Sequence, residues 1–342
     1  MGFLKDKTLG FFVKTGGIFS QYLFGGKVHI FMLHRVLPEN LRTEYHYNRD
    51  LAITPDKLEA YIIRLKKEKY QFISLDELYE LIRNNRWRKK KYICFTLDDG
   101  YRDNITYGLP IFEKYQVPFA IYVTNCFPNG TAHFWWYWLE KKIKENNEVI
   151  YDNRVFETKN EIQKLSVYNT LSSEIRKFNI EQRNNLLKTF FNKSDTEIRS
   201  ESYELSLNWG ELREIINHPL ITIGAHTLNH YALSRLEHNE MEDEIISGKS
   251  EMESKLGIKI EHFAYPYGSL KDANNREFDC VKKLGFKTAV LNHPGNIFNS
   301  SKNATEKLPR YPLGNNTSRE RFEQYLNGIQ HFSTNHWNKI PK

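Results

Sequence analysis

The sequence predicts an α/β fold in which a parallel sheet curls into a barrel. Short apolar runs with strand character alternate with amphipathic helical patterns along most of the 342 residues. This alternation is typical of a parallel sheet, and the number of repeated units favours a barrel over an open sheet. The alternation stops once, between residues 126 and 205, so the barrel is predicted to carry an insertion.

The part of the chain before the insertion shows each element by its own local signal. Thr54 provides an N-cap, and Pro55 a first-turn proline, for a helix whose apolar residues recur on one face. The continuous apolar run 92–97 has the length of a strand that is buried on both faces. The elements predicted here are strand 28–33, a helix from Thr54, helix 74–84, strand 92–97, helix 104–115 and strand 119–124.

The insertion is rich in asparagine, lysine, glutamate and aromatic residues, and helical stretches are predicted over 138–144 and 180–191. It follows a strand end and opens with the aromatic run 135–138, so it is predicted to lie over the carboxyl-terminal face of the barrel. The alternation then resumes with helix 209–216, strand 221–225, helix 241–256, strand 262–265, helix 274–284, strand 288–291 and a last helix 318–329.

Residues 1–27 form a separate N-terminal segment, in which aromatic and aliphatic side chains are interrupted by Lys5, Lys7 and Lys14. One interpretation is a helix that covers the bottom of the barrel. The other is a segment that lies on a membrane surface, with its lysines facing anionic headgroups. A cleavable signal peptide needs a longer apolar stretch and a small-residue cleavage site, and neither is present. The sequence therefore predicts a protein that is cytoplasmic or peripheral to the inner membrane.

The positive net charge favours partners that carry negative charge. The net charge of +7 suits an anionic glycan, a membrane surface or nucleic acid. No zinc-finger spacing, RNA-binding aromatic signature or basic helix is present, so nucleic acid is not an expected partner. The three cysteines, Cys94, Cys126 and Cys280, are scattered along the chain, and Cys94 in its apolar run is expected to be a buried free thiol.

Three polar clusters stand at the ends of predicted strands. Asp98 and Asp99 follow strand 92–97, His226 and His230 follow strand 221–225, and the run Tyr-Pro-Tyr-Gly occupies 265–268. Each cluster is a weak signal alone, because paired aspartates before a glycine most often form a turn and most His-x3-His pairs are accidental. The catalytic groups of such barrels lie at the carboxyl ends of strands, so the three clusters are predicted to converge.

Together the clusters supply a set of metal ligands. The spacing of His226 and His230 puts two imidazoles on one face of a helical turn. With one of the two aspartates they give a three-ligand set that leaves open positions for water and substrate. Side chains diverge on a tight loop, so the other aspartate is free to face the water as a general base. Hydrolysis of an amide or ester also needs donors for the oxyanion, and a backbone N–H in the rigid turn 266–268 is a candidate.

At these residues the sequence resembles the polysaccharide deacetylase family, whose shared unit is the NodB-homology domain. The matching stretches are 95–100, 224–230 and 263–268, and the resemblance spans about 28–312 apart from the insertion. The resemblance implies a distorted (β/α)7 barrel that removes N-linked acetyl groups from amino sugars with zinc or another divalent metal. Carried over position by position, it makes Asp98 the base and Asp99, His226 and His230 the metal ligands, and Tyr267 would donate its backbone N–H to the oxyanion.

Two departures from the family pattern leave roles to be assigned. Members often carry an arginine that tethers the base, three residues ahead of Tyr267, and here that position is Ala264. Arg310 is the candidate replacement, with a plain surface arginine as the alternative. The late histidine that usually acts as the general acid is matched only loosely by His293. We predict that His34 takes this role, because it ends strand 28–33 at the face where the aspartates emerge.

The predicted substrate is an N-acetylated glycan, either a bacterial surface polysaccharide or a lipid-linked precursor, and any membrane contact would be peripheral. Trp209 is expected to form part of the wall of the acetyl pocket, and Tyr101 to contact the substrate. The aromatic run 135–138 would either stack on sugar rings or bury the insertion's own core. Two other functions stay open, a deformylase or deacetylase of a lipid-linked sugar and a catalytically inactive glycan-binding barrel.

Overall fold

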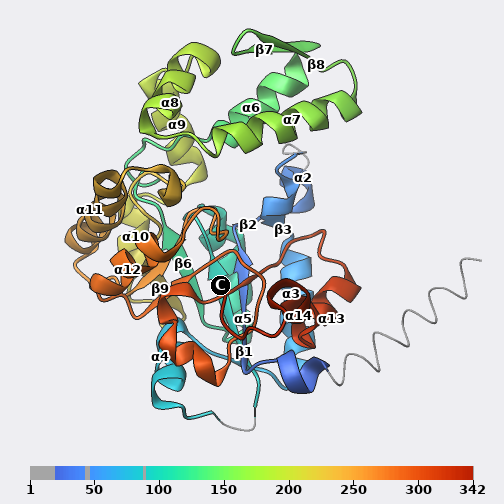
Figure 1. Ribbon diagram of the computed structural model, residues 1–342, viewed down its shortest axis with the longest axis vertical. Coiled ribbons are helices and arrows are strands. Elements are labelled where there is room, and N and C mark those ends of the chain that lie inside the picture. Colours follow the sequence, from blue (N-terminus) through green and yellow to red (C-terminus); the bar gives the residue numbers. More distant parts are fainter. Residues whose placement is uncertain (1–19, 43–46, 88–89, 342) are drawn as a thin grey trace, which may run out of the picture.

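The computed structural model describes residues 20–42, 47–87 and 90–341, and its main sheet is a curled sheet of parallel strands (Figure 1). The strand order is β11-β10-β9-β6-β5-β1-β12, and β4 pairs with β5 beside this path. The ladders within this sheet are parallel, as the alternation with helices predicts. The strands are β1 (Val28–Leu33), β4 (Gln71–Phe72), β5 (Tyr92–Leu97), β6 (Phe119–Val123), β9 (Ile221–Ala225), β10 (His262–Ala264), β11 (Thr288–Val290) and β12 (Tyr311–Pro312).

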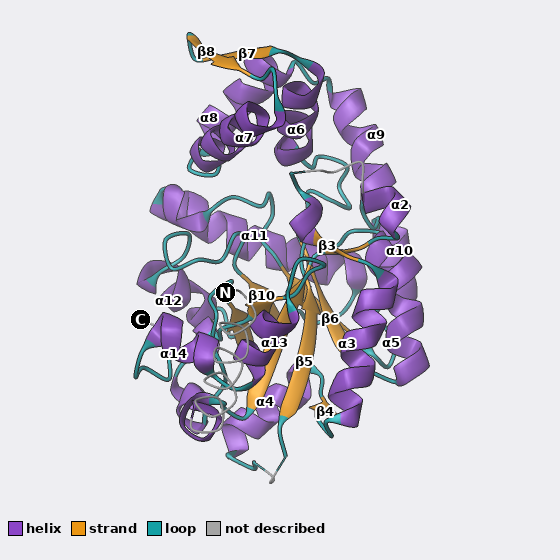
Figure 2. Ribbon diagram, turned by 90° about the vertical axis from the view of Figure 1, so that its right-hand side faces the viewer, coloured by secondary structure: helices purple, strands orange, loops and turns teal. Residues whose placement is uncertain are grey.

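The two ends of this sheet approach one another, which gives a distorted barrel. An isolated parallel bridge joins Val290, at the end of β11, to Leu308, shortly before β12. Figure 2 shows the strands in the interior with helices packed around them. Every residue of β1 and β5 is buried, as the continuous apolar runs predict.

The N-cap predicted at Thr54 is present. The side chain of Thr54 accepts a hydrogen bond from the backbone N–H of Lys57, and Ser74 forms a capping box with Glu77. Outside the insertion the α-helices are α2 (Glu39–Arg42), α3 (Pro55–Lys67), α4 (Leu75–Asn84), α5 (Leu109–Tyr115), α10 (Trp209–Ile215), α11 (His238–Leu256), α12 (Asn275–Lys283), α13 (Arg319–Leu326) and α14 (Ile329–Asn335). Short 3-10 helices are η1 (Arg49–Leu51), η4 (Leu233–Arg235), η5 (Asn299–Asn303) and η6 (Thr305–Lys307), and η2 (Asn104–Gly108) is a π-helix. Strands β2 (Arg35–Val36) and β3 (Ala52–Ile53) pair with each other.

The last predicted helix, 318–329, is present as α13 but ends at Leu326, and α14, which was not predicted, follows it. Gly328 lies between them with a φ of 82°, and a Cβ at this position would stand 2.4 Å from the carbonyl carbon of Phe24. The break brings α14 against the N-terminal part of the chain, where the rings of Phe24 and Phe332 are 4.8 Å apart. Residues 1–19 of the predicted N-terminal segment lie outside the described residues. Within the described part of the chain, no helix is long and apolar enough to cross a membrane.

Residues 126–205 form a lobe at one end of the barrel, seen at the top of Figure 1 and Figure 2. The lobe has a hydrophobic core of its own, which buries the aromatic run 135–138. An antiparallel hairpin that the sequence analysis did not predict pairs Val149 with Phe156. The elements of the lobe are α6 (Trp135–Glu145), β7 (Glu148–Tyr151), β8 (Arg154–Glu157), α7 (Glu161–Ile175), α8 (Ile180–Leu186), η3 (Leu187–Phe191) and α9 (Asp195–Leu205).

Candidate active site

The three polar clusters converge in one cavity at the carboxyl ends of the strands. This cavity, called the catalytic cavity below, has a volume of about 310 Å³. Parallel neighbours in a sheet present their carboxyl ends on the same side, so residues that follow β1, β5, β9 and β10 meet there. The predicted residues that line the cavity are His34, Asp98, Asp99, His226, His230 and Tyr267.

Asp99, His226 and His230 form a cluster that fits a divalent metal. The Nε2 atoms of both histidines lie 3.3 Å from Oδ1 of Asp99, and the three possible ligand atoms lie within 4.8 Å of one another. All three side chains are buried, and Oδ1 of Asp99 has no hydrogen-bond partner. Burial would raise the pKa of Asp99, but the two imidazoles hold that pKa well below its ordinary value. An ionised carboxylate beside two imidazoles is a donor set that suits zinc.

The surroundings of the two histidines favour the neutral imidazole form that can bind a metal. Nδ1 of His226 lies 2.8 Å from the carbonyl oxygen of Ala264. A carbonyl oxygen only accepts, so Nδ1 carries the proton and Nε2 keeps the lone pair that faces Asp99. Burial lowers the pKa of His230, which favours the neutral imidazole that a metal requires.

The loop between the two histidines is not the helical turn that their spacing predicts. Thr227 and His230 have φ angles of 66° and 58°, outside the right-handed helical region. Glu244 of α11 holds the loop by accepting hydrogen bonds from the backbone N–H and the side-chain amide of Asn229, at 2.8 and 2.7 Å. The two imidazoles therefore converge through a tethered irregular loop, and the predicted helical geometry was wrong.

Asp98 and Asp99 diverge as predicted, because the chain reverses directly after β5. Asp99 has a φ of 78° and Gly100 a φ of 90°, a left-handed pair that glycine makes accessible at the second position. Asp98 turns to Arg310, whose two terminal nitrogens each lie 2.6 Å from one carboxylate oxygen. Burial would raise the pKa of Asp98, but the charge and hydrogen bonds of Arg310 outweigh it and lower that pKa below its ordinary value. The carboxylate stays ionised, as a general base must.

Arg310 therefore contacts Asp98 in the way proposed for the missing tether at Ala264. The guanidinium is fully buried, so the alternative of a plain surface arginine is wrong. It also donates to the hydroxyl of Thr96 at 2.9 Å and to the carbonyl oxygen of Leu291 at 3.1 Å. These four hydrogen bonds fix the guanidinium, and through it the carboxylate, in one orientation.

The two candidate acids occupy different places. His34 is half-buried and lines the catalytic cavity. His293 does not line it, because its ring bonds to the side chain of Asn335 in α14, with Nε2 2.7 Å from Oδ1. The position of His34 is the one that the prediction requires, and its role as the acid stays a prediction.

Two predicted substrate contacts lie outside the catalytic cavity. Trp209 donates its indole N–H to Oδ1 of Asn129 at 2.8 Å, and its ring packs against the barrel's hydrophobic core. Tyr101 is fully buried, with the guanidinium carbon of Arg35 4.8 Å from its ring centre. Neither residue lines the cavity, and contact of either with the substrate stays a prediction.

The insertion sends the predicted aromatic run and two arginines that were not predicted, Arg176 and Arg183, towards the site. Trp135, Trp136 and Arg176 line the catalytic cavity, which agrees with the prediction that the insertion lies over it. Arg183 of α8 is 2% exposed and donates to the carbonyl oxygen of His230 at 3.1 Å. The guanidinium carbon of Arg176 lies 4.6 Å from the ring centre of Tyr267. Basic residues are frequent in the insertion, so no local signal marked these two.

The chain is similar in sequence to known proteins. The chain matches the family model described as "Polysaccharide deacetylase" over residues 176–289, about a third of its length. Two curated relatives, the poly-beta-1,6-N-acetyl-D-glucosamine N-deacetylases of Escherichia coli strain K12 and O157:H7, are each 22% identical over 291 residues. The alignments cover 85% of this chain and 38% of each relative, so the chain spans about two fifths of the length of these relatives.

Solved structures share the fold. The Streptococcus pyogenes deacetylase PplD, in complex with acetate, superposes with a TM-score of 0.56 at 16% identity, covering 88% of this chain and 97% of that chain. IcaB from Ammonifex degensii gives a TM-score of 0.55 at 14% identity, covering 89% of this chain and 98% of that chain. These matches confirm the predicted barrel and the predicted resemblance to polysaccharide deacetylases.

Proposed function

We propose that this chain, which is similar in sequence and fold to polysaccharide deacetylases, is a metal-dependent hydrolase that removes N-acetyl groups from amino sugars of a bacterial surface polysaccharide or its precursor. The observation that carries the proposal is the ion pair of Asp98 and Arg310 beside the cluster of Asp99, His226 and His230. The curated relatives are named for deacetylation of an N-acetylglucosamine polymer, which supports this substrate class. We propose zinc as the metal because one carboxylate and two imidazoles suit it.

Each residue of the cavity would perform a different step of amide hydrolysis. A divalent metal held by the cluster would polarise the acetamide carbonyl and lower the pKa of a water molecule. Asp98, kept ionised by Arg310, would take a proton from that water as the new C–O bond forms. The backbone N–H of Tyr267 would donate to the oxyanion. His34 would protonate the nitrogen as the C–N bond breaks, which releases acetate and the free amino sugar.

The space around the site favours a substrate longer than one sugar. A second cavity of about 580 Å³ extends toward α13 and includes Ser318 and Arg321 in its lining. Both cavities are lined by Met32, His34, Asp50, Leu51 and Asn292. Because the two cavities share these lining residues, they adjoin, and neighbouring sugars of a chain would have room beyond the residue that reacts.

The proposal is tested by acetate release. Purified protein, loaded with zinc or treated with a chelator, is incubated with N-acetylglucosamine oligosaccharides and with lipid-linked amino sugars, and mass spectrometry follows the loss of acetyl groups. We expect release that stops with chelator and returns with zinc, and none from a His226→Ala/His230→Ala double variant. Full metal occupancy in that variant would refute the proposed metal site. Glycan binding without any acyl loss would favour the inactive barrel, and reaction of lipid-linked sugars alone would favour the precursor enzyme.

A further inference from the structure

Two predicted site residues with left-handed backbones are in contact with one buried arginine of the insertion. His230 and Tyr267 have φ angles of 58° and 59°, which are unfavourable for a residue that carries a Cβ. Such backbones persist in folded proteins where the surrounding structure holds them in place. Arg183, in α8, donates to the carbonyl oxygen of His230 at 3.1 Å and to the hydroxyl of Tyr267 at 3.5 Å. One side chain of the insertion therefore bonds to both residues.

Further contacts join these three side chains into one group beside the catalytic cavity. The ring centres of His230 and Tyr267 are 4.9 Å apart. The guanidinium carbon of Arg183 lies 4.1 Å from the ring centre of Tyr231, the residue that follows His230. On its other side, the backbone N–H of His230 donates to Oγ1 of Thr227 at 3.1 Å. The left-handed backbone of His230 is thus held at its N–H from within its own loop and at its carbonyl from the insertion.

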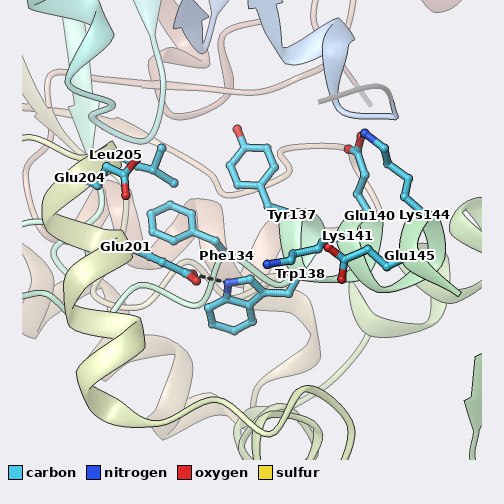
Figure 3. Close-up of a pocket in the computed structure, with 10 residues that line it drawn as sticks. All are labelled: Phe134, Tyr137, Trp138, Glu140, Lys141, Lys144, Glu145, Glu201, Glu204 and Leu205. Atoms are coloured by element: carbon cyan, nitrogen blue, oxygen red, sulfur yellow. Dashed lines mark hydrogen bonds and ion pairs between the residues drawn. The ribbon is translucent and has the colours of Figure 1, made fainter. Parts of the chain in front are cut away.

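The guanidinium of Arg183 is buried without a counter-ion. It is 2% exposed, its Nε has no hydrogen-bond partner, and no carboxylate in the described part of the chain forms an ion pair with it. Two other basic side chains of the insertion do lie beside carboxylates. Arg176 pairs with Asp272 at 3.0 Å, and Figure 3 shows Lys144 next to Glu140, with Nζ and Oε1 4.0 Å apart. A buried charge without a counter-ion is unfavourable, so the partners that compensate Arg183 are the polar groups of the candidate site.

We propose that Arg183 is a positioning residue of the candidate active site, which holds the backbones of His230 and Tyr267 in their left-handed conformations. This inference rests on the proposed function, in which His230 binds the metal and the backbone N–H of Tyr267 donates to the oxyanion. Arg183 does not line the catalytic cavity, so it acts through these two residues and not on the substrate. The insertion thereby completes the geometry of the site as well as covering it.

The first test separates geometry from charge in zinc-saturated protein. Arg183→Met removes both hydrogen bonds, so kcat for N-acetylglucosamine oligosaccharide should fall roughly 10- to 100-fold while KM stays within about threefold. Arg183→Lys keeps the charge but not the planar fork of donors, and its kcat should lie between those of Arg183→Met and the wild type. Lys188→Met, at an exposed position of η3, is the control and should keep kcat within about twofold. A wild-type kcat in Arg183→Lys would overturn the inference, because charge alone would then suffice.

The second test reads the metal ligands without turnover. Protein is loaded with cobalt(II) in place of zinc, because the visible absorption of bound cobalt depends on the geometry of its ligands. The spectrum of Arg183→Met should differ from that of the wild type, and the spectrum of Lys188→Met should not. Arg183→Lys keeps the buried charge, so it is measured alongside in case Arg183→Met does not fold. An Arg183 that only stabilised the fold would leave kcat and spectrum unchanged in both variants, which would overturn the inference.

The outcomes also separate this inference from the proposed function. A spectrum that changes in the Arg183 variants, while the wild type releases no acetate, would leave the inference standing and refute the catalytic proposal. Acetate release by the wild type, with kcat and spectrum unchanged in the Arg183 variants, would refute the inference alone. Absence of cobalt binding by the wild type would overturn both.

Discussion

Replacing Arg310 with methionine isolates the ion pair on which the proposed base depends. Methionine keeps an unbranched side chain of similar length but removes the charge and all five N–H donors. Asp98 would then be a buried carboxylate without a partner, and the carbonyl oxygen of Leu291 would lose the guanidinium that donates to it. Thr96 retains a partner, because its hydroxyl also donates to the carbonyl oxygen of Phe31.

The expected loss of stability follows from these contacts. Removing one partner of a buried ion pair costs about 3–5 kcal/mol, and an orphaned carbonyl adds about 1 kcal/mol. Arg310→Met should therefore lower the free energy of unfolding by about 4–6 kcal/mol. Adding Asp98→Asn removes the stranded charge, so the double variant should recover about 2–3 kcal/mol of this loss.

Urea unfolding of metal-free protein, followed by tryptophan fluorescence, measures these differences without a contribution from metal binding. Arg319→Met, at an exposed position of α13, serves as the control and should change stability by less than about 0.5 kcal/mol. A loss below about 1 kcal/mol in Arg310→Met would refute the reasoning, because the pair would then be neither buried nor coupled as described. A double variant whose loss equals the sum of the single losses would refute the coupling.

Four further outcomes are expected. Asp98→Asn should keep the metal and lose turnover, because it removes the base and no ligand; loss of metal in elemental analysis would contradict this. His34→Ala should keep the metal while kcat falls roughly 10²- to 10⁴-fold. If kcat of His34→Ala stays near the wild-type value while kcat of His293→Ala falls strongly, His293 is the acid instead. Arg183→Met should weaken zinc binding roughly 10- to 100-fold in a chelator competition, because the carbonyl of His230 loses its donor; equal affinity would leave Arg183 without a role at the metal. Burial lowers the pKa of His29 from 6.5 to about 3, so below pH 6.5 the unfolded chain takes up this proton first and stability falls. The loss should reach about 2 kcal/mol between pH 6.5 and pH 5 in urea titrations, and an equal pH dependence in His29→Gln would contradict it.

Local chemistry was enough to place most of the barrel. The cap at Thr54, the capping box at Ser74 and the apolar run of β5 act within a few residues, so their effect is visible in the sequence itself. The interruption between α13 and α14 at the end of the chain was not predicted. Gly328, where it occurs, packs closely against the backbone of Phe24, which belongs to the distant N-terminal part of the chain. Hairpin β7-β8 in the insertion was missed as well.

The core of the candidate site was also predictable, for a topological reason. Parallel strands put their carboxyl ends on one side, so polar residues after β5 and β9 had to meet once the sheet was assigned. This places Asp99, His226 and His230 together without knowledge of any loop conformation. The left-handed backbone at Thr227 and His230 lay beyond such reasoning, because it is held by Glu244 of a separate helix.

The sequence by itself determined the type of fold, the strand ends that carry the candidate site and the Asp-His-His cluster, because each depends on local periodicity or on the common direction of the strands. Only the tertiary structure decided which side chains complete the site. Arg310 reaches Asp98 across 212 residues of chain, and Arg183 and Trp136 arrive from an insertion whose position depends on packing. A buried guanidinium and an exposed one look alike in a sequence; what separates them is the partner that the folded chain brings within hydrogen-bond distance.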